Sequence, residues 1–325
     1  MWRKIQSDWP AYLLSFVVLL IILTKAIKTD QRQQPTVSND STWHAPSMYL
    51  NPIKDKQERD LISYGKELIA NTSAYLGPKG SVMQISNGMN CQNCHLDAGT
   101  KPNGNNFSAV YANYPLFRER SGKVESIYKR VSDCFERSLN GTTPDSNSRE
   151  YQAIHAYIQW VGKDVPKGTH PKGSGIKRPN YLERAADPEK GKKVYAIHCE
   201  RCHGSNGEGQ LNPENTGYSY PPLWGKNSYN TGAGLYRLSN FAGYIQENMP
   251  FNEVTDQHKL TDEEAWDIAA YVNSQPRPVM KENHDWPHLN KKPIDHPFGP
   301  YADSFSEQQH KYGPFLPILF ARDKN

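Results

Sequence analysis

Four of the five cysteines in this 325-residue chain fall into two copies of one short motif. The first copy consists of Cys91, Cys94 and His95, and the second of Cys199, Cys202 and His203. Two thiols separated by two residues can reach the two vinyl groups of one haem, and the histidine that follows can then bind the iron. Zinc sites usually combine two Cys-x-x-Cys units, and redox dithiols need no histidine. The sequence therefore predicts two covalently bound haem c groups, with His95 and His203 as the proximal iron ligands.

The sixth ligand of each iron has to come from elsewhere in the chain. Met249, followed by Pro250, lies 46 residues after His203 and just before a helical pattern. A thioether at this position raises the reduction potential of a haem. Met280 lies beyond that helix and His258 lies at its start, and these are the alternatives. We expect Met249 to be the distal ligand of the second iron.

The first motif has no methionine between His95 and the next helical pattern, but it has the fifth cysteine. Cys134 follows His95 by 39 residues, a separation comparable to that between His203 and Met249. A free cysteine is often a buried and inert residue, which is the simpler alternative. The charged neighbours Asp133, Glu136 and Arg137 do not fit an apolar setting. Cys134 is therefore predicted to be an iron ligand, a nucleophile, or both.

Basic side chains are concentrated in the 20 residues that end just after Cys134. They are Arg118, Arg120, Lys129, Arg130 and Arg137. If residues 126–139 are helical, Arg130, Cys134 and Ser138 lie on one face. Guanidinium groups favour the thiolate form of a nearby cysteine and bind oxyanions through paired hydrogen bonds. A single arginine is most simply a solvated surface charge, but this set beside one thiol predicts an anionic substrate.

Composition and periodicity indicate a mainly α protein with two cytochrome c-like domains. The chain has 23 glycines, 24 prolines and only 36% hydrophobic residues, which predicts short helices, long loops and cores completed by haem. Its net charge of +4 is close to balanced and gives no indication of nucleic-acid binding. Helical patterns span residues 60–75 and 148–161 around the first motif.

The same plan recurs around the second motif. Asp187 followed by Pro188 predicts a helix start before Cys199, and Thr261 with Glu264 forms a capping box for a closing helix. The predicted domains are residues 55–165 and 181–276, joined by a linker at 166–180. Residues 277–325 have no sustained period and are expected to form an irregular C-terminal arm.

The N-terminus is typical of an export segment. Arg3 and Lys4 precede an uncharged stretch over residues 9–24, which is shorter than the ~20 residues of a usual membrane-spanning helix. No small-x-small cleavage site follows it. We favour an uncleaved membrane anchor at residues 1–28, with a polar tether at 29–54, over a cleaved signal peptide. Either alternative predicts that the domains work outside the cytoplasm, in the periplasm.

Two stretches around the fifth cysteine resemble the active-site region of the dihaem thiosulfate dehydrogenases, a family that includes tetrathionate reductases. They are Tyr114-Pro-Leu-Phe-Arg118-Glu-Arg120 and the segment from Arg130 to Gly141. Asn248-Met249-Pro250 and residues 295–301 are also similar, and the resemblance extends from about residue 55 to the C-terminus. It implies His95/Cys134 ligation of the first iron and substrate binding by Arg120, Arg130 and Ser138. Some members have a lysine where this chain has Asn248, so plain His203/Met249 ligation is expected here.

The resemblance implies an enzyme that joins two thiosulfate anions to tetrathionate, or runs the reverse reaction. Cys134 would be the reacting sulfur, and the electrons would leave through the second haem to an external acceptor such as another cytochrome c. The competing interpretation is a membrane-tethered dihaem electron shuttle without enzymatic activity, for which Cys134 and its arginines would be a coincidence. A dihaem peroxidase would need an open iron site and explains the arginines no better.

Overall fold

The computed structural model describes residues 42–50, 52–255, 257–281 and 285–323. The chain divides into two units, residues 1–40 and 41–325, and all described residues belong to the second. The anchor predicted at residues 1–28 lies outside the described residues. Within the described ranges, no helix combines the length and the apolar character needed to cross a membrane.

The first half of the described chain is built from short helices and one hairpin. Its helices are α2 (Lys56–Ala70), α3 (Thr72–Leu76), α4 (Leu96–Gly99), α5 (Val110–Asn113), α6 (Ile127–Asp133) and α7 (Arg149–Val161), with a 3₁₀ turn, η1 (Cys91–Asn93), and a π-helical turn, η2 (Cys134–Ser138). The strands β1 (Leu116–Arg118) and β2 (Lys123–Glu125) pair antiparallel, with Leu116 opposite Glu125. Asp55 caps α2 and Ser148 caps α7 through their side-chain oxygens.

The second half repeats this plan. It contains α8 (Pro188–His198), α9 (Glu200–His203), β3 (Gln210–Leu211), β4 (Tyr218–Tyr220), the 3₁₀ turn η3 (Gly234–Tyr236), α10 (Leu238–Asn248) and α11 (Asp262–Ser274). The two strands pair antiparallel with an irregular register. Asp187 caps α8, and the Thr261 and Glu264 side chains form the capping box of α11, as the sequence predicts.

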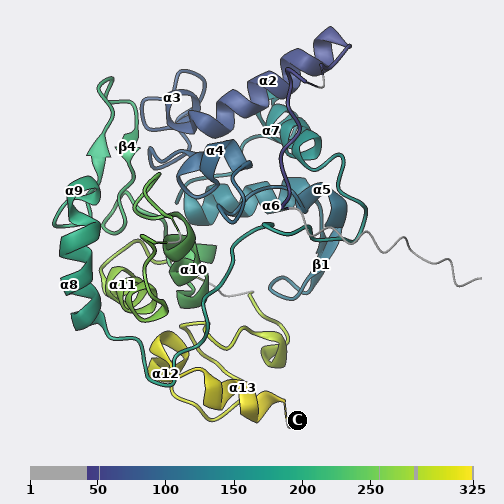
Figure 1. The fold of residues 1–325 in the computed structure, drawn as a ribbon. Coiled ribbons are helices and arrows are strands. Elements are labelled where there is room, and N and C mark those ends of the chain that lie inside the picture. The colour runs from purple at the N-terminus through teal and green to yellow at the C-terminus, as the bar shows by residue number, and fades with distance from the viewer. Residues whose placement is uncertain (1–41, 51, 256, 282–284, 324–325) are drawn as a thin grey trace, which may run out of the picture. The chain divides into compact units, whose positions relative to one another are not determined.

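In each half the helix before the haem motif crosses the closing helix at a glycine. A Cβ added at Gly65 in α2 would lie 1.9 Å from the carbonyl oxygen of Ala153 in α7. One added at Gly191 in α8 would lie 1.8 Å from the carbonyl oxygen of Asp267 in α11. Only glycine allows such close backbone approach, and the ribbon shows α2 beside α7 in one half and α8 beside α11 in the other (Figure 1).

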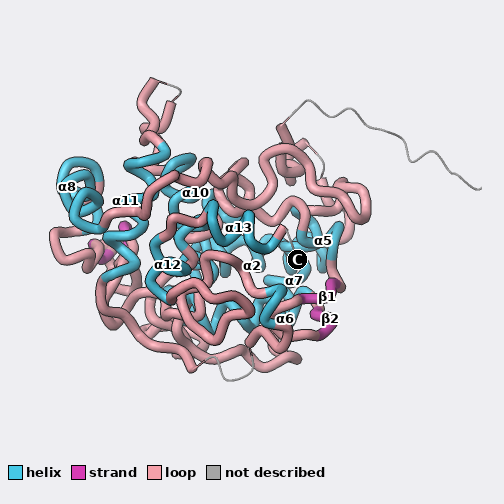
Figure 2. Tube along the Cα trace, turned by 90° about the horizontal axis from the view of Figure 1, so that it is seen from below, coloured by secondary structure: helices cyan, strands magenta, loops and turns pink. Residues whose placement is uncertain are grey.

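Two hydrophobic cores follow from these crossings. The first contains Leu68, Ile154 and Tyr157, and the second contains Tyr195 and Trp266. The first haem motif lies where the cores meet, because Cys94 packs against both of them. The mainly α architecture with two cytochrome c domains agrees with the prediction, and loops make up much of the described chain between the helices (Figure 2).

The C-terminal arm contains more helix than its sequence predicts. Its elements are a 3₁₀ turn, η4 (Leu289–Lys291), and the helices α12 (Glu307–Tyr312) and α13 (Leu316–Arg322). These helices have 6 and 7 residues, which is too short for a periodic pattern to develop. Buried Asp295 fastens the arm to the second core by accepting hydrogen bonds from Arg237 and Ser239.

The segment predicted to link the domains is bound along the first domain. The backbone N–H groups of Asn103 and Asn105 donate to the carbonyl oxygens of Gly173 and Gly175, at 2.8 and 2.9 Å. The predicted domain boundaries at residues 165 and 181 stay a prediction.

Candidate haem sites and active site

Both predicted proximal histidines are held in the same way. Nδ1–H of His95 donates to the carbonyl oxygen of Asn105 at 2.6 Å, and Nδ1–H of His203 donates to that of Pro221 at 2.9 Å. This hydrogen bond places the proton on Nδ1 and leaves the lone pair of Nε2 to bind iron, which is the usual arrangement of an iron-ligating histidine. Both histidines therefore fit haem ligation.

The second motif lies in a cavity of about 850 Å³. Cys199, Cys202, His203 and Met249 all line it, together with the apolar side chains Leu235, Ile245, Leu260, Ile268 and Val272. The mixture of two thiols, an imidazole, a thioether and an apolar wall suits a covalently bound haem. Burial lowers the pKa of His203, which favours the neutral imidazole that binds iron.

The two alternative ligands lie elsewhere. A Cβ added at Gly232 would lie 2.5 Å from Sδ of Met280, so this thioether packs against a loop rather than among the cavity residues. His258 is exposed, and its backbone N–H donates to Oγ1 of Thr255. The geometry therefore favours Met249 over both alternatives.

The three cysteines of the first domain differ in their electrostatic surroundings. Burial raises the pKa of Cys91 and of Cys94 to about 12, which keeps both thiols neutral. Burial also opposes ionisation of Cys134, but the Arg130 guanidinium and a hydrogen bond with His95 outweigh it and lower the pKa of this thiol to about 7. Cys134 is therefore the cysteine of this domain whose surroundings stabilise a thiolate.

The Cys134 side chain is opposite the proximal histidine. The His95 side chain is one of the groups that lower the pKa of the Cys134 thiol, so the two side chains predicted to bind the first iron are neighbours in the structure. The residue opens the π-helical turn η2, in which the N–H of Leu139 donates to the carbonyl oxygen of Cys134 at 2.9 Å. Single π-helical turns are rare and often occur at functional sites. The helical condition set for residues 126–139 is met by α6 and this turn, but nothing in the sequence indicates the change of helix type.

Helix α6, which leads into this turn, is fixed to α7. The Ser132 hydroxyl and the Tyr151 hydroxyl share a hydrogen bond of 2.5 Å, and the Tyr151 hydroxyl also donates to the carbonyl oxygen of Tyr128. Phe135, the residue after Cys134, is 1% exposed in the first core. Cys134 is thus carried by an element that is fixed on both sides.

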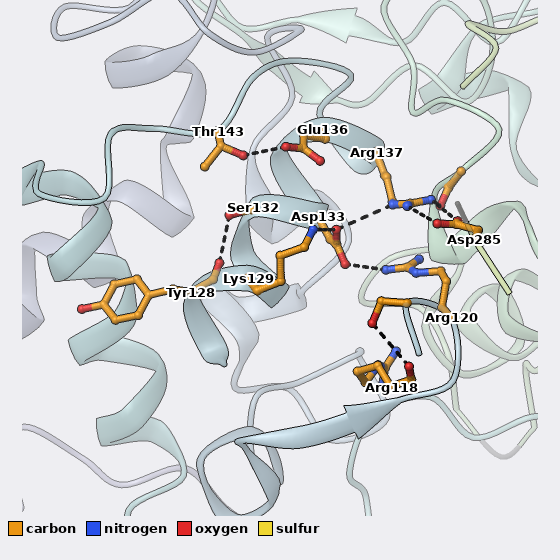
Figure 3. Close-up of polar contacts among 12 residues, drawn as sticks. Arg118, Arg120, Tyr128, Lys129, Ser132, Asp133, Glu136, Arg137, Thr143 and Asp285 are labelled. Carbon is orange, nitrogen blue, oxygen red and sulfur yellow. Dashed lines mark hydrogen bonds and ion pairs between the residues drawn. The ribbon is translucent and has the colours of Figure 1, made fainter. Parts of the chain in front are cut away.

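A buried carboxylate organises the basic side chains. Asp133 accepts hydrogen bonds from Nη2 of Arg120 at 2.7 Å and Nζ of Lys129 at 2.6 Å, and Nε of Arg137 lies 3.9 Å from it. Figure 3 shows Asp133 between these three side chains. Burial opposes its ionisation, yet the neighbouring cations, led by Arg120, keep the pKa of Asp133 below its usual value. In the sequence Asp133 is only one of the charged neighbours of Cys134, and nothing there indicates that it binds Arg120 and Lys129.

The C-terminal arm contributes a second carboxylate. The Asp285 carboxylate accepts hydrogen bonds from Nη1 and Nη2 of Arg137, at 2.8 and 2.9 Å (Figure 3). The next residue, Trp286, donates its backbone N–H to the carbonyl oxygen of Arg120 at 2.6 Å. The arm therefore holds two of the arginines from outside the first domain. A separation of 148 residues between Arg137 and Asp285 hides this contact from the sequence.

The predicted substrate residues are distributed around the thiol as follows. Arg130 has its strongest charge interaction with Cys134, and its pKa is raised by that sulfur. Ser138 ends the π-helical turn that Cys134 begins. Arg120 is largely buried and turned toward Asp133, and its pKa is lowered first by burial and then by the nearby guanidinium groups of Arg137 and Arg130. The roles of these residues in the reaction stay predictions.

Comparison with known proteins places this site in context. A family model described as "Cytochrome c" matches residues 188–276, and one described as "SoxA/TsdA, cytochrome c domain" matches residues 81–166. The chain is 35% identical to a thiosulfate dehydrogenase of Stutzerimonas stutzeri over 79% of its own length and 82% of that protein. It is 38% identical to a thiosulfate dehydrogenase of Allochromatium vinosum over 85% of its length and 98% of that protein.

A solved structure of a thiosulfate dehydrogenase is also similar to this chain. The thiosulfate dehydrogenase TsdBA of Marichromatium purpuratum, in its "as isolated" form, is similar with a TM-score of 0.66 at 32% identity. The similarity covers 74% of this chain and 50% of that one, so the chain matches half of the TsdBA polypeptide.

Two c-type haem motifs on two helical cytochrome c domains define a dihaem cytochrome c with two covalently bound haem groups. Within that class, the chain belongs to the thiosulfate dehydrogenase family and is an enzyme of this kind.

Proposed function

We propose that this enzyme joins two thiosulfate anions to tetrathionate and that Cys134 is the reacting sulfur. The observation that carries the proposal is the position of one thiol opposite His95 and beside Arg130, with surroundings that stabilise its thiolate. The names of the curated relatives supply the substrate. The same residues serve the reverse reaction, and the potential of the external redox partner decides which direction is used.

The reaction is proposed to run in two steps on Cys134. In the first, the thiolate bonds to the outer sulfur of thiosulfate, giving a cysteine S-thiosulfonate and releasing two electrons. In the second, the outer sulfur of another thiosulfate attacks the outer sulfur of this adduct. The S–S bond to Cys134 then breaks, tetrathionate leaves and the thiolate is restored. No proton is gained or lost over the cycle.

The main electrostatic obstacle is the approach of two dianions to a thiolate. Guanidinium groups oppose this repulsion most strongly where water is excluded, and they hold sulfonate oxygens by charge-assisted hydrogen bonds. We assign this role to Arg120 and Arg130, with Ser138 as a neutral donor. Because Asp133 and Asp285 bind the neighbouring cations, we expect Arg130 to be the residue most available to the substrate.

His95 and Cys134 would hold the first haem, and His203 and Met249 the second. When bound, the two haems provide one-electron storage for the two electrons and an exit through the second haem to an external acceptor. Thiolate ligation favours a low potential and methionine a higher one, which sets this direction.

A thiosulfate and tetrathionate assay in both directions, on purified protein with both haems attached, tests the proposal. We expect turnover in the unchanged protein and none in Cys134→Gly. Substantial activity in Cys134→Gly would overturn the mechanism. No activity with either substrate in the unchanged protein would favour the electron shuttle instead.

We further propose that the enzyme works in the periplasm and is held at the inner membrane by residues 1–28. The basic residues before an apolar stretch and the covalent haem attachment support this location. N-terminal sequencing of the protein from the membrane fraction tests it. An intact N-terminus in that fraction is expected, whereas a processed soluble protein would rule out the anchor.

A further inference from the structure

At the end of the π-helical turn that carries Cys134, the backbone of the turn does not supply N–H donors for all of its own carbonyl oxygens. The N–H of Gly141 donates to the carbonyl oxygen of Phe135, and the N–H of Thr142 donates to that of Ile85 in another segment. The chain then turns away at Asn140, which has a φ of 43°. The carbonyl oxygens of Glu136 and Arg137 therefore point beyond the end of the turn, where buried acceptors need donors from elsewhere.

One asparagine of the second domain supplies these donors. The backbone N–H of Asn230 donates to the carbonyl oxygen of Arg137 at 3.0 Å. Its Nδ2 donates to the carbonyl oxygen of Glu136 at 2.8 Å and to Oδ1 of Asn140 at 3.0 Å. Its Oδ1 accepts from the N–H of Gly232 at 3.0 Å, and the residue is 3% exposed. Every polar group named here is bonded, so the side chain has one well-defined orientation.

The loop that carries Asn230 is itself well fixed. Its neighbour Tyr229 lines the cavity of the second haem motif and donates to Oδ1 of Asn273 at 2.9 Å. Nδ2 of Asn87, from the first domain, donates to the carbonyl oxygen of Ser228 at 3.1 Å. The second domain thus presents Asn230 to the first domain from a rigid support.

A π-helical turn is less favourable than an α-helical one and persists where its surroundings hold it. In an α-helical turn the N–H of Ser138, rather than that of Leu139, would reach the carbonyl oxygen of Cys134. A change to an α-helical turn would therefore reorient the side chains of Cys134 and Ser138, which begin and end the turn.

We propose that Asn230 is a positioning residue: it holds the π-helical turn and thereby keeps Cys134 opposite His95. This inference rests on the proposed function, because it assumes that Cys134 reacts at the first haem. It makes the second domain part of the active site's framework as well as the exit for electrons.

The test compares Asn230→Ala with Gln246→Ala in the full chain with both haems attached. Gln246 is the matched control, because it is 7% exposed and donates Nε2 to the carbonyl oxygen of Leu260 and to Oδ1 of Asp262, and these contacts within the second domain involve neither Asn230 nor Tyr229. The readouts are the electron paramagnetic resonance spectrum of the first haem and the separate values of kcat and KM. Asn230→Ser, which keeps one donor, gives a second and milder variant should the alanine protein fail to fold.

We expect Asn230→Ala to weaken or split the thiolate signal of the first haem and to lower kcat by up to about 100-fold, the scale for a reacting group displaced by ~1 Å. The serine variant should lie between this protein and the unchanged one, and Gln246→Ala should keep the thiolate signal. A normal signal and normal kcat in Asn230→Ala and Asn230→Ser would overturn the inference. Absence of a thiolate signal in the unchanged protein would instead overturn the proposed function.

Discussion

The Cys134 thiol and the His95 imidazole are neighbours in the structure, and the ring helps to lower the pKa of the thiol, although 39 residues separate the two in the chain. The far side of the same ring is held by the carbonyl oxygen of Asn105. One histidine therefore lies between a structural acceptor and a thiol with a lowered pKa. This relationship links haem attachment to sulfur chemistry, and it distinguishes the first haem site from the second.

Replacing Arg130 by glutamine is expected to raise KM for thiosulfate by about 10- to 100-fold. A hydrogen bond to a charged group contributes ~1.5–3 kcal/mol, and ~1.4 kcal/mol corresponds to a factor of ten in affinity. The Cys134 thiol should also titrate at higher pH, because Arg130 is the main group that lowers its pKa. Steady-state kinetics at several pH values measure both effects.

The matched control for this substitution is Arg59→Gln. Arg59 is an exposed residue of α2 whose Nη1 donates to the carbonyl oxygen of Ile53. It should leave KM unchanged. Equal KM values for Arg130→Gln and the unchanged enzyme would show that Arg130 does not bind the substrate.

Replacing Met249 by leucine is expected to lower the reduction potential of the second haem and to leave the spectrum of the first unchanged. Methionine ligation raises a haem potential, and leucine keeps the volume without the thioether. Met280→Leu is the control, because Met280 packs at Gly232 and is not among the residues that line the second cavity. A spectroelectrochemical titration of each variant measures the reduction potential of the second haem and so distinguishes Met249 from Met280 as its ligand. A potential that falls in Met280→Leu but not in Met249→Leu would reverse the ligand assignment.

Much of the fold can be predicted from local sequence, because each haem motif, helix cap and closing helix is determined by residues that are close together in the chain. Asp187 and Thr261 cap their helices as their positions predict. The π-helical turn at Cys134 was not predictable, since a single turn of 5 residues is too short to give a recognisable apolar period of its own. The contacts of Asp285 and Asn230 join segments far apart in the chain, and single-sequence periodicity contains no information about such pairs.

The attachment of the C-terminal arm is expected to weaken in acid. Asp295 is buried, and although burial itself opposes ionisation, Arg237 and Ser239 hold its pKa below the usual value near 3.9. A carboxylate with a lowered folded pKa stabilises the fold above its unfolded pKa, and this stability is lost as the pH falls through the folded pKa. Asp295→Asn should therefore reduce the free energy of unfolding at pH 7 by about 2 kcal/mol.

As the pH falls below the unfolded pKa, near 3.9, the difference between Asp295→Asn and the unchanged protein should begin to shrink, and it should disappear once the pH passes the lower folded pKa and the carboxyl of the folded protein is neutral. Urea unfolding between pH 3 and pH 7, as chosen test conditions spanning the usual carboxyl range, measures it. A difference that is constant over this range would exclude the Asp295 carboxylate as its source.

The helix crossing in the second domain should not tolerate a methyl group. Gly191→Ala gains ~1 kcal/mol of helix propensity, but the new Cβ would lie 1.8 Å from the backbone oxygen of Asp267. Overpacking against backbone costs about 1–3 kcal/mol or more, so a net loss of stability is expected. Gly234→Ala is the control, since a Cβ there meets nothing within 4 Å. Equal urea midpoints for the two variants would contradict the packing argument.

The most direct test of the account is electron paramagnetic resonance of the oxidised full-length protein beside Cys134→Gly. The account predicts a low-spin ferric signal with a thiolate signature in the unchanged protein, together with a separate His/Met signal from the second haem. The thiolate signature should be absent in Cys134→Gly while both haems stay attached. Two His/Met signals in the unchanged protein, both unaffected by Cys134→Gly, would contradict the assignment of the first haem as the reaction site.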